Sequence, residues 1–319
     1  MINTVHIPIL VEPIIDALLA PLRALSEEAD PQWLVDCTLG GGGHTAALLA
    51  ALASDPKLRR HKLLSIDRDP SAIARAAERF ETELSAGRLE IVHSPFGSAA
   101  DLVRSRPVAG LMADLGFSSD QMNDPARGFS FQTEGPLDMR LDPSRGQSAR
   151  EFLSRIPERE LEEVLSKYGE ERFSRRIAGA IVEHRRKHGP PSTTRELSDV
   201  VVRAVPPNMR HGRIHAATRT FQAIRIAVNE ELEELDCLLK RVILGVKPGG
   251  RVAILSFHSL EDRMVKHAFR SAPFKPLHKK PIEADDEEVR RNPRARSAKL
   301  RIAERQPDES AGEPNGGAS

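Results

Sequence analysis

Four consecutive glycines, Gly40 to Gly43, lie between a short apolar run and a helical pattern, and His44 follows them directly ("DCTLGGGGH", 36–44). A glycine-rich turn between a strand and a helix lets backbone N–H groups approach a ligand, and a helix N-terminus favours a negative group by ~0.3–1 kcal/mol. Two ligands fit: a dinucleotide pyrophosphate, or the carboxylate of the methionine half of S-adenosylmethionine. The glycines are also compatible with a tight turn that only packs closely on the sheet.

An acidic residue, Asp67, closes the next apolar run ("LLSIDRDP", 63–70). At the end of a strand its carboxylate could accept both hydroxyls of a ribose, in NAD and S-adenosylmethionine sites alike. The dinucleotide fingerprint G-x-G-x-x-G, started from Gly40 and Gly42, needs a third glycine where Thr45 stands. These residues predict a nucleoside site, and the dinucleotide match is incomplete.

Two further residues follow predicted strands. Phe96 ("HSPFGS", 93–98) offers a flat apolar face to an adenine. Asp114 ends a strand at the carboxyl edge of the sheet, where ligands of open α/β folds collect. Ser256 and His258 ("SFHS") could suggest a hydrolase, but the sequence has no Gly-x-Ser-x-Gly elbow, so we favour a structural cluster there.

A parallel sheet would bring these residues to one edge. Short apolar runs predict strands at 33–37, 62–66, 89–92 and 108–113, with helices at 44–54 and from Pro70, for which Asp69 is a candidate N-cap. This alternation predicts an α/β fold with a mostly parallel sheet.

The strand pattern stops after Asp114. Residues 115–147 read as a Gly-, Pro- and Asp-rich loop, and helices are expected near 148–156, 158–168, 170–188 and 194–204. A long helix at 218–244, a Pro-Gly-Gly turn and a strand at 251–256 then resume the α/β pattern, and 295–305 ("ARSAKLRIAER") alternates like a closing edge strand. We therefore predict an α/β domain from 1–117 and 218–305, an inserted helical domain at 118–217, a solvated loop at 283–288 and a disordered tail at 306–319.

Composition places the chain among ordinary globular proteins. It has 319 residues, 39% hydrophobic and 29% charged, and its two cysteines, Cys37 and Cys237, form no metal or disulfide pattern. It shows no leader and no apolar run of membrane-spanning length, so we predict a cytoplasmic protein without a membrane anchor. The formal net charge is +1, so a nucleic-acid footprint would have to be local.

Two acid-poor segments could supply that footprint. No acidic residue lies between Asp199 and Glu230, and 172–189 holds a single one, Glu183. Their arginines are the candidate RNA-binding residues: Arg203, Arg210, Arg213, Arg219 and Arg225 in the first segment, and Arg175, Arg176, Arg185 and Arg186 in the second. Charge runs are often only solvated helix faces, but two of them in a balanced chain favour a phosphate-binding surface.

The chain as a whole also resembles one family of class I methyltransferases, the bacterial RsmH (MraW) rRNA small-subunit methyltransferases. The resemblance covers roughly residues 6–305 and is carried by "HIPIL", "DCTLGGGGH", "SIDRDP", "DLGFSSDQM", "GPLDMRLDP", "YGEERFSRRIA", "ATRTFQAIRIAVNEEL", "PGGRVAILSFHSLEDRMVK" and "NPRARSAKLRIAER". It implies a Rossmann-like fold and S-adenosylmethionine-dependent methylation of N4 of a cytidine in the decoding (P-site) region of 16S rRNA, within the small ribosomal subunit or its precursor.

The resemblance also implies a site. Its cofactor contacts fall on Gly42, Gly43, His44, Asp67, Phe96, Asp114 and Gln121. Asp114 is the candidate catalytic residue, although the Asn- or Asp-Pro-Pro-aromatic motif of other amino-methyltransferases is absent; no metal is expected. A nicotinamide-dependent oxidoreductase and a non-catalytic RNA-binding ribosome assembly factor are the alternative functions, and a homodimer is considered.

Overall fold

The computed structural model describes residues 8–210 and 214–307, which divide into two compact units. The sheet unit contains the described residues up to Asp67, together with Ser71–Gly116 and the chain from Glu234 onward. The helical unit contains Arg68–Pro70 and Phe117–Glu233. The predicted α/β fold with a helical insert is confirmed.

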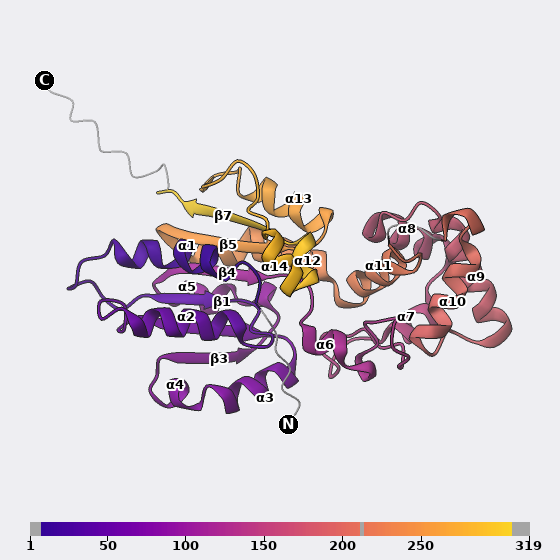
Figure 1. The fold of residues 1–319 in the computed structure, drawn as a ribbon, viewed down its shortest axis with the longest axis horizontal. Coiled ribbons are helices and arrows are strands. Elements are labelled where there is room, and N and C mark those ends of the chain that lie inside the picture. The colour runs from indigo at the N-terminus through magenta and orange to yellow at the C-terminus, as the bar shows by residue number, and fades with distance from the viewer. Residues whose placement is uncertain (1–7, 211–213, 308–319) are drawn as a thin grey trace, which may run out of the picture. The chain divides into compact units, whose positions relative to one another are not determined.

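Seven strands form the sheet in the order β3-β2-β1-β4-β5-β7-β6 (Figure 1). The first five in the sequence pair in parallel, and β7 is antiparallel to both neighbours. Their bounds are Trp33–Asp36 (β1), Lys62–Asp67 (β2), Leu89–His93 (β3), Val108–Asp114 (β4), Val246–Ser256 (β5), Phe274–Pro276 (β6) and Lys299–Arg305 (β7). Because β1, β2 and β4 are buried on both faces, they read in the sequence as continuous apolar runs.

Two apolar clusters cover the faces of this sheet. One packs α1 (Val11–Arg23), α2 (Gly43–Ser54) and the end of α3 (Pro70–Arg79) on the strands. The other contains α5 (Ala100–Arg104), the region after α12 (Glu231–Cys237) and α13 (Ser259–Ala268). The remaining helices of this unit are α4 (Glu81–Ser85) and α14 (Asp286–Arg291).

Three sequence predictions for this unit need correction. Residues 295–305 do not form an edge strand, because Phe274–Pro276 pairs with the outer side of β7. The acidic segment 283–288 is not only a loop: Asp285 caps α14, which extends through Arg291. The Pro-Gly-Gly turn lies within β5, where the pairing with β4 jumps from Val246 to Arg251 and the residues between them bulge out.

The helix expected at 218–244 is broken. Helix α11 (Thr218–Asn229) ends at Glu230, which has a left-handed φ of 52°, and α12 is followed by a π-helical turn at Leu238–Val242. The side chain of Asn229 explains the break: it accepts the N–H of Leu141 at 2.7 Å and donates to the carbonyl of Met139 at 2.7 Å. Helix α11 packs in the helical unit, which therefore extends to Glu233, beyond the boundary expected at residue 217.

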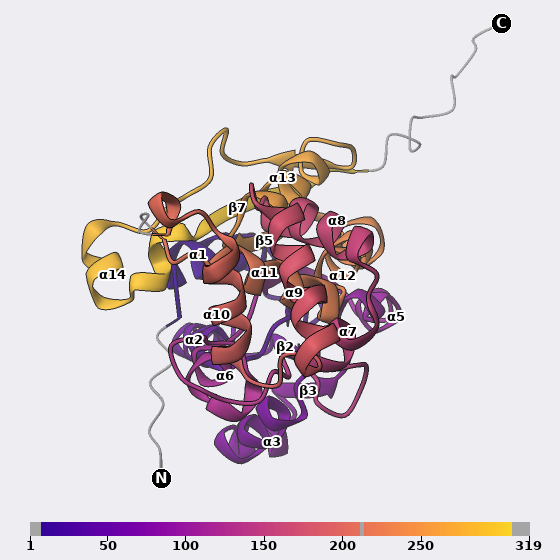
Figure 2. The same cartoon turned by 90° about the vertical axis from the view of Figure 1, so that its right-hand side faces the viewer.

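The helical unit surrounds its own apolar core. Its helices are α6 (Ser119–Asn123), α7 (Ala149–Arg155), α8 (Glu158–Gly169), α9 (Ser174–His188), α10 (Thr194–Ala204) and α11, and Figure 2 shows α8 to α11 as neighbours. Capping boxes start α6 at Ser118 and α7 at Ser148. Within the part of the chain that the structure describes, no helix combines the length and the apolar character needed to cross a bilayer.

Candidate functional site

The glycine turn connects β1 to the first turn of α2. Gly40 and Gly42 have φ values of 50° and 73°. A Cβ at Gly42 would also lie 2.9 Å from Cε2 of Phe80, so both backbone conformation and space require glycine there. Gly42 is the N-cap of α2 and brings no capping side chain. The turn therefore presents backbone N–H groups at a helix N-terminus, which is an arrangement that accepts an anion.

Asp67 lies against this turn. It is the last residue of β2, and its Oδ2 accepts the N–H of Gly40 at 2.6 Å. Phe96 begins a short 3-10 turn after β3 and is half-buried against the apolar cluster that contains Ile66. Sequence reasoning placed both residues after neighbouring strands, and the structure brings both to the carboxyl edge of the sheet.

Asp114 ends β4, on the other side of β1 from Asp67. Its Oδ2 lies 3.6 Å from Nδ1 of His44, whose side chain is only 5% exposed and whose Nε2 lies 3.0 Å from the carbonyl oxygen of Ile9. Burial raises the pKa of Asp114 to about 6, against the opposing effect of His44 and of Arg294. The carboxylate is thus charged at pH 7 and close enough to neutrality there to exchange a proton readily.

Asp36 is a residue of this site that sequence reasoning missed. It is fully buried at the end of β1, accepts the hydroxyl of Thr45 at 2.7 Å and accepts the N–H of Thr38 at 3.0 Å. Burial raises its pKa, while His44, Thr45 and Thr38 act to lower it. Because Thr45 lies in the first turn of α2, Asp36 ties the strand to the helix on both sides of the glycines. Its place at the start of the "DCTLGGGGH" stretch was the available signal.

Gln121 belongs to the helical unit. It completes the capping box of α6, with its Oε1 accepting the N–H of Ser118 at 2.9 Å, and its Nε2 donates to Oδ2 of Asp69 at 2.8 Å. Asp69, which is 1% exposed, also pairs with Arg127 at 3.1 Å. The amide of Gln121 is therefore held in a fixed orientation by a residue that follows Asp67 by two positions.

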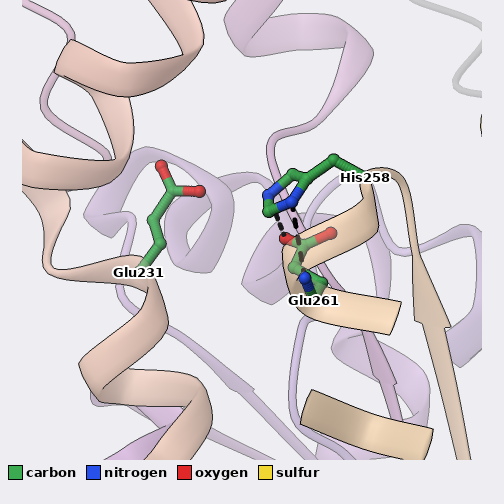
Figure 3. Close-up of side chains that lie close together, drawn as sticks. All are labelled: Glu231, His258 and Glu261. Carbon is green, nitrogen blue, oxygen red and sulfur yellow. Dashed lines mark hydrogen bonds and ion pairs between the residues drawn. The ribbon is translucent and has the colours of Figure 1, made fainter. Parts of the chain in front are cut away.

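Ser256 and His258 make separate contacts. The hydroxyl of Ser256 donates to the carbonyl of Lys299 at 3.3 Å. His258 is the N-cap of α13, and its Nε2 lies 3.2 Å from Oε1 of Glu261 (Figure 3). This is a cap at the end of a strand, as the sequence favoured, and the two side chains do not form a nucleophile and its base.

The candidate RNA-binding arginines fall into different environments. Four of them have contacts within the helical unit: Arg185 with the carbonyls of Leu153 and Ile156, Arg210 with those of Arg203 and Val205, Arg219 with that of Glu170, and Arg225 with both carboxylate oxygens of Glu231 at 2.8 Å. Four others are exposed: Arg175, Arg176, Arg186 and Arg203. Arg213 lies outside the described residues.

Comparison with known proteins identifies the family. The model of the MraW methylase family matches residues 3–306. Ribosomal RNA small subunit methyltransferase H of a Synechococcus species is 49% identical over 282 residues, which are 85% of either chain. The proteins of that name from two Prochlorococcus marinus strains are 47% and 45% identical, over 92% and 95% of this chain and 91% and 96% of their own. The chain belongs to the MraW methylase family, whose methyl donor is S-adenosylmethionine.

Proposed function

We propose that this protein transfers the methyl group of S-adenosylmethionine to N4 of a cytidine in the decoding (P-site) region of 16S rRNA, in the small ribosomal subunit or its precursor. One observation carries the proposal: four neighbouring strands are ended or followed by groups that suit, in order, adenine, ribose, the methionine carboxylate and the acceptor amine. Along β3, β2, β1 and β4, these are Phe96, Asp67, the glycine turn and Asp114.

The first three of these groups each suit a part of the donor. The face of Phe96 would lie against adenine, and Asp67 would accept the ribose hydroxyls. The N–H of Gly43, at the start of α2, would bind the methionine carboxylate, because that of Gly42 already donates to the carbonyl of Leu39 at 2.7 Å. The donor supplies a methyl group that its sulfonium has already activated. The protein's part is therefore alignment, which can contribute effective molarities of ~10^5 to 10^8 M.

Asp114 is the proposed acceptor for the cytidine amine. The lone pair of that amine is delocalised into the base, so an acceptor must hold its N–H group while the lone pair turns toward the methyl. Transfer forms an N–C bond, breaks an S–C bond and releases one proton from the amine. A carboxyl pKa of about 6 suits that step, because the group is ionised at pH 7 and still basic enough to take the proton.

The RNA substrate is inferred from the names of the relatives and from surface charge. Arg175, Arg176 and Arg186 on α9 and Arg203 on α10 are exposed and available for phosphates. Aromatic residues are few, although Phe131 stacks on His215 with 4.6 Å between ring centroids. The target base would have to leave its stack to reach the methyl donor.

Methyl transfer to ribosomal particles tests the proposal. Purified protein, labelled S-adenosylmethionine and either small-subunit particles or naked 16S rRNA should give label on one cytidine, located by nucleoside mass spectrometry. Label on another atom, or none on either substrate, would contradict it. Calorimetry with S-adenosylmethionine and with NAD tests the oxidoreductase alternative, which requires binding of NAD and not of S-adenosylmethionine. RNA binding without any methyl transfer would favour the assembly-factor alternative.

Two finer expectations are still predictions. Cytoplasmic localisation is expected for an enzyme with a ribosomal substrate, and fractionation of cells tests it. A homodimer is tested by light scattering across a range of protein concentrations.

A further inference from the structure

A basic segment of the sheet unit lies outside every site described so far. Residues 263–282 contain no aspartate or glutamate, although the chain as a whole is balanced. The segment runs from α13 through β6 into the loop that follows. Its basic residues are Arg263, Lys266, His267, Arg270, Lys275, His278, Lys279 and Lys280.

The loop of this segment is fixed at both ends. The N–H of Leu277 donates to the carbonyl of Ile302 at 2.9 Å, and Ile282 exchanges two hydrogen bonds with Leu300, at 2.8 and 2.9 Å. Between these anchors β7 has a single intervening residue, Arg301, whereas the loop has four, 278–281 ("HKKP"). The four residues therefore project from the sheet as an arch, which we call the basic arch.

A pocket of about 350 Å³ lies beside the basic arch. Phe269, Leu277 and Ile302 contribute apolar lining, and the basic lining residues are Lys266, Arg270, His278, Lys279 and Arg301. Arg301 is neutralised by Asp262 at 2.7 Å. Of the other four, Lys266, Arg270 and Lys279 are cations with no carboxylate within 4.0 Å in the described part of the chain, so the pocket concentrates uncompensated positive charge.

We propose that the basic arch and its pocket bind the phosphate backbone of the RNA substrate, as a contact separate from the arginines of the helical unit. That the polyanion is RNA rests on the function proposed above. Phosphate binding fits because the anchored arch holds its cations in place before binding, which lowers the ordering cost. It also lacks an exposed Phe, Tyr or Trp side chain for stacking, so we expect the contact to position the RNA without reading its sequence.

A membrane surface fits the same charge less well. Interfacial binding needs apolar side chains beside the basic ones, and Leu277, at 37% exposure, is the one large apolar residue of the segment that is more than about a third exposed. The experiment below therefore includes anionic vesicles as a separate arm.

The test removes four charges from the arch and its pocket by Lys266→Gln, Arg270→Gln, Lys279→Gln and Lys280→Gln. The control removes four exposed charges of the same unit that each pair with an acid: Arg23→Gln, Lys57→Gln, Lys240→Gln and Arg291→Gln. Both proteins have the same net charge, so a general loss of attraction affects them equally.

The arch variant should bind 16S rRNA at least about 10-fold more weakly than the control at ~0.15 M salt. The slope of log K against log salt should fall in magnitude by about 3, because each of the four lost phosphate contacts contributes ~0.7–0.9. Affinity for S-adenosylmethionine, measured by calorimetry, should equal that of the control and show that the sheet unit is intact.

Equal RNA affinities and equal salt slopes in the two variants would overturn the proposal. So would unchanged RNA binding combined with lost binding to phosphatidylglycerol vesicles. The proposed function fails by a different result, the absence of methyl transfer by the unmodified protein, and the binding comparison does not depend on turnover.

Discussion

The carboxyl group of Asp114 is buried and lies 3.6 Å from Nδ1 of His44. Burial raises its pKa to about 6, while His44 and Arg294 hold it from rising further. The neutral form is therefore favoured only below pH 6, and His44 is fixed by the carbonyl oxygen of Ile9. As the proposed proton acceptor, Asp114 should make the rate of methyl transfer change with pH near 6, above the pH range in which an exposed aspartate titrates.

The rate of methyl transfer should fall as the pH drops through 6, because protonated Asp114 cannot accept the amine proton. We expect kcat to show an inflection near pH 6. Asp114→Asn should remove the inflection and lower kcat by on the order of 10²-fold. The exposed Asp101→Asn variant is the control and should keep both the rate and the inflection. An unchanged profile in Asp114→Asn would reject Asp114 as the acceptor.

Asp67 should determine cofactor affinity. Asp67→Ala removes the proposed acceptor of the ribose hydroxyls and the acceptor of the Gly40 N–H, so the glycine turn loses a support as well. Hydrogen bonds to charged groups contribute about 1.5–3 kcal/mol, which predicts at least a 10-fold rise in the Kd for S-adenosylmethionine by calorimetry. RNA affinity should be unaffected, and an unchanged cofactor Kd would place the ribose elsewhere.

Among the elements, the strands could be predicted and the junctions could not. Continuous apolar runs identified the strands that end at Asp67 and Asp114, because burial on both faces leaves a local record in the sequence. The break after α11 has no such local sequence pattern, because it depends on hydrogen bonds of Asn229 with Met139 and Leu141, far away in the chain. Strand β6 was missed because its three residues carry no periodic pattern.

The site follows the same rule. Asp67 and Asp114, which end strands, were found from local pattern, whereas Asp36, which also ends a strand, was missed. The contacts of Asp36 with Thr45 and of Gln121 with Asp69 join separate elements and could be known only from the structure.

The helix break at Glu230 predicts an unusual response to glycine. A non-glycine residue in the left-handed region costs roughly 1–2 kcal/mol, so Glu230→Gly should leave the free energy of unfolding unchanged or raise it. Ala227→Gly, within α11, should lower it by about 1 kcal/mol. Urea denaturation of the two variants compares them, and a loss of stability in Glu230→Gly as large as that in Ala227→Gly would contradict the assignment.

At the scale of the whole molecule, the candidate cofactor residues lie mostly in one unit, whereas the proposed RNA contacts lie in both, with the basic arch in the sheet unit. Six of the seven candidate cofactor residues belong to the sheet unit, and the exposed arginines belong to the helical unit. Changes in one set should therefore leave the affinity measured for the other set intact.

Removing Arg175, Arg176 and Arg186 together by substitution with Gln should weaken RNA binding and reduce its salt dependence, because their exposed charges are the proposed phosphate contacts. The matched control replaces three cations of the helical unit that each pair with an acid, Arg159, Lys167 and Arg195. Affinity for S-adenosylmethionine should be the same in both. If the two variants bind RNA equally well, the exposed arginines of α9 are not phosphate contacts and only face solvent.

The position of β7 in the sheet has a consequence for synthesis of the chain. The last described strand lies between β5 and β6, so the sheet cannot be completed until nearly the whole chain has left the ribosome. Almost all of the helical unit, in contrast, is one uninterrupted segment, Phe117–Glu233, and can fold earlier. Nascent chains arrested before β7 should resist protease within that segment while the earlier strands remain open to cleavage. The helical unit would then fold before the sheet unit, which contains most of the candidate cofactor residues.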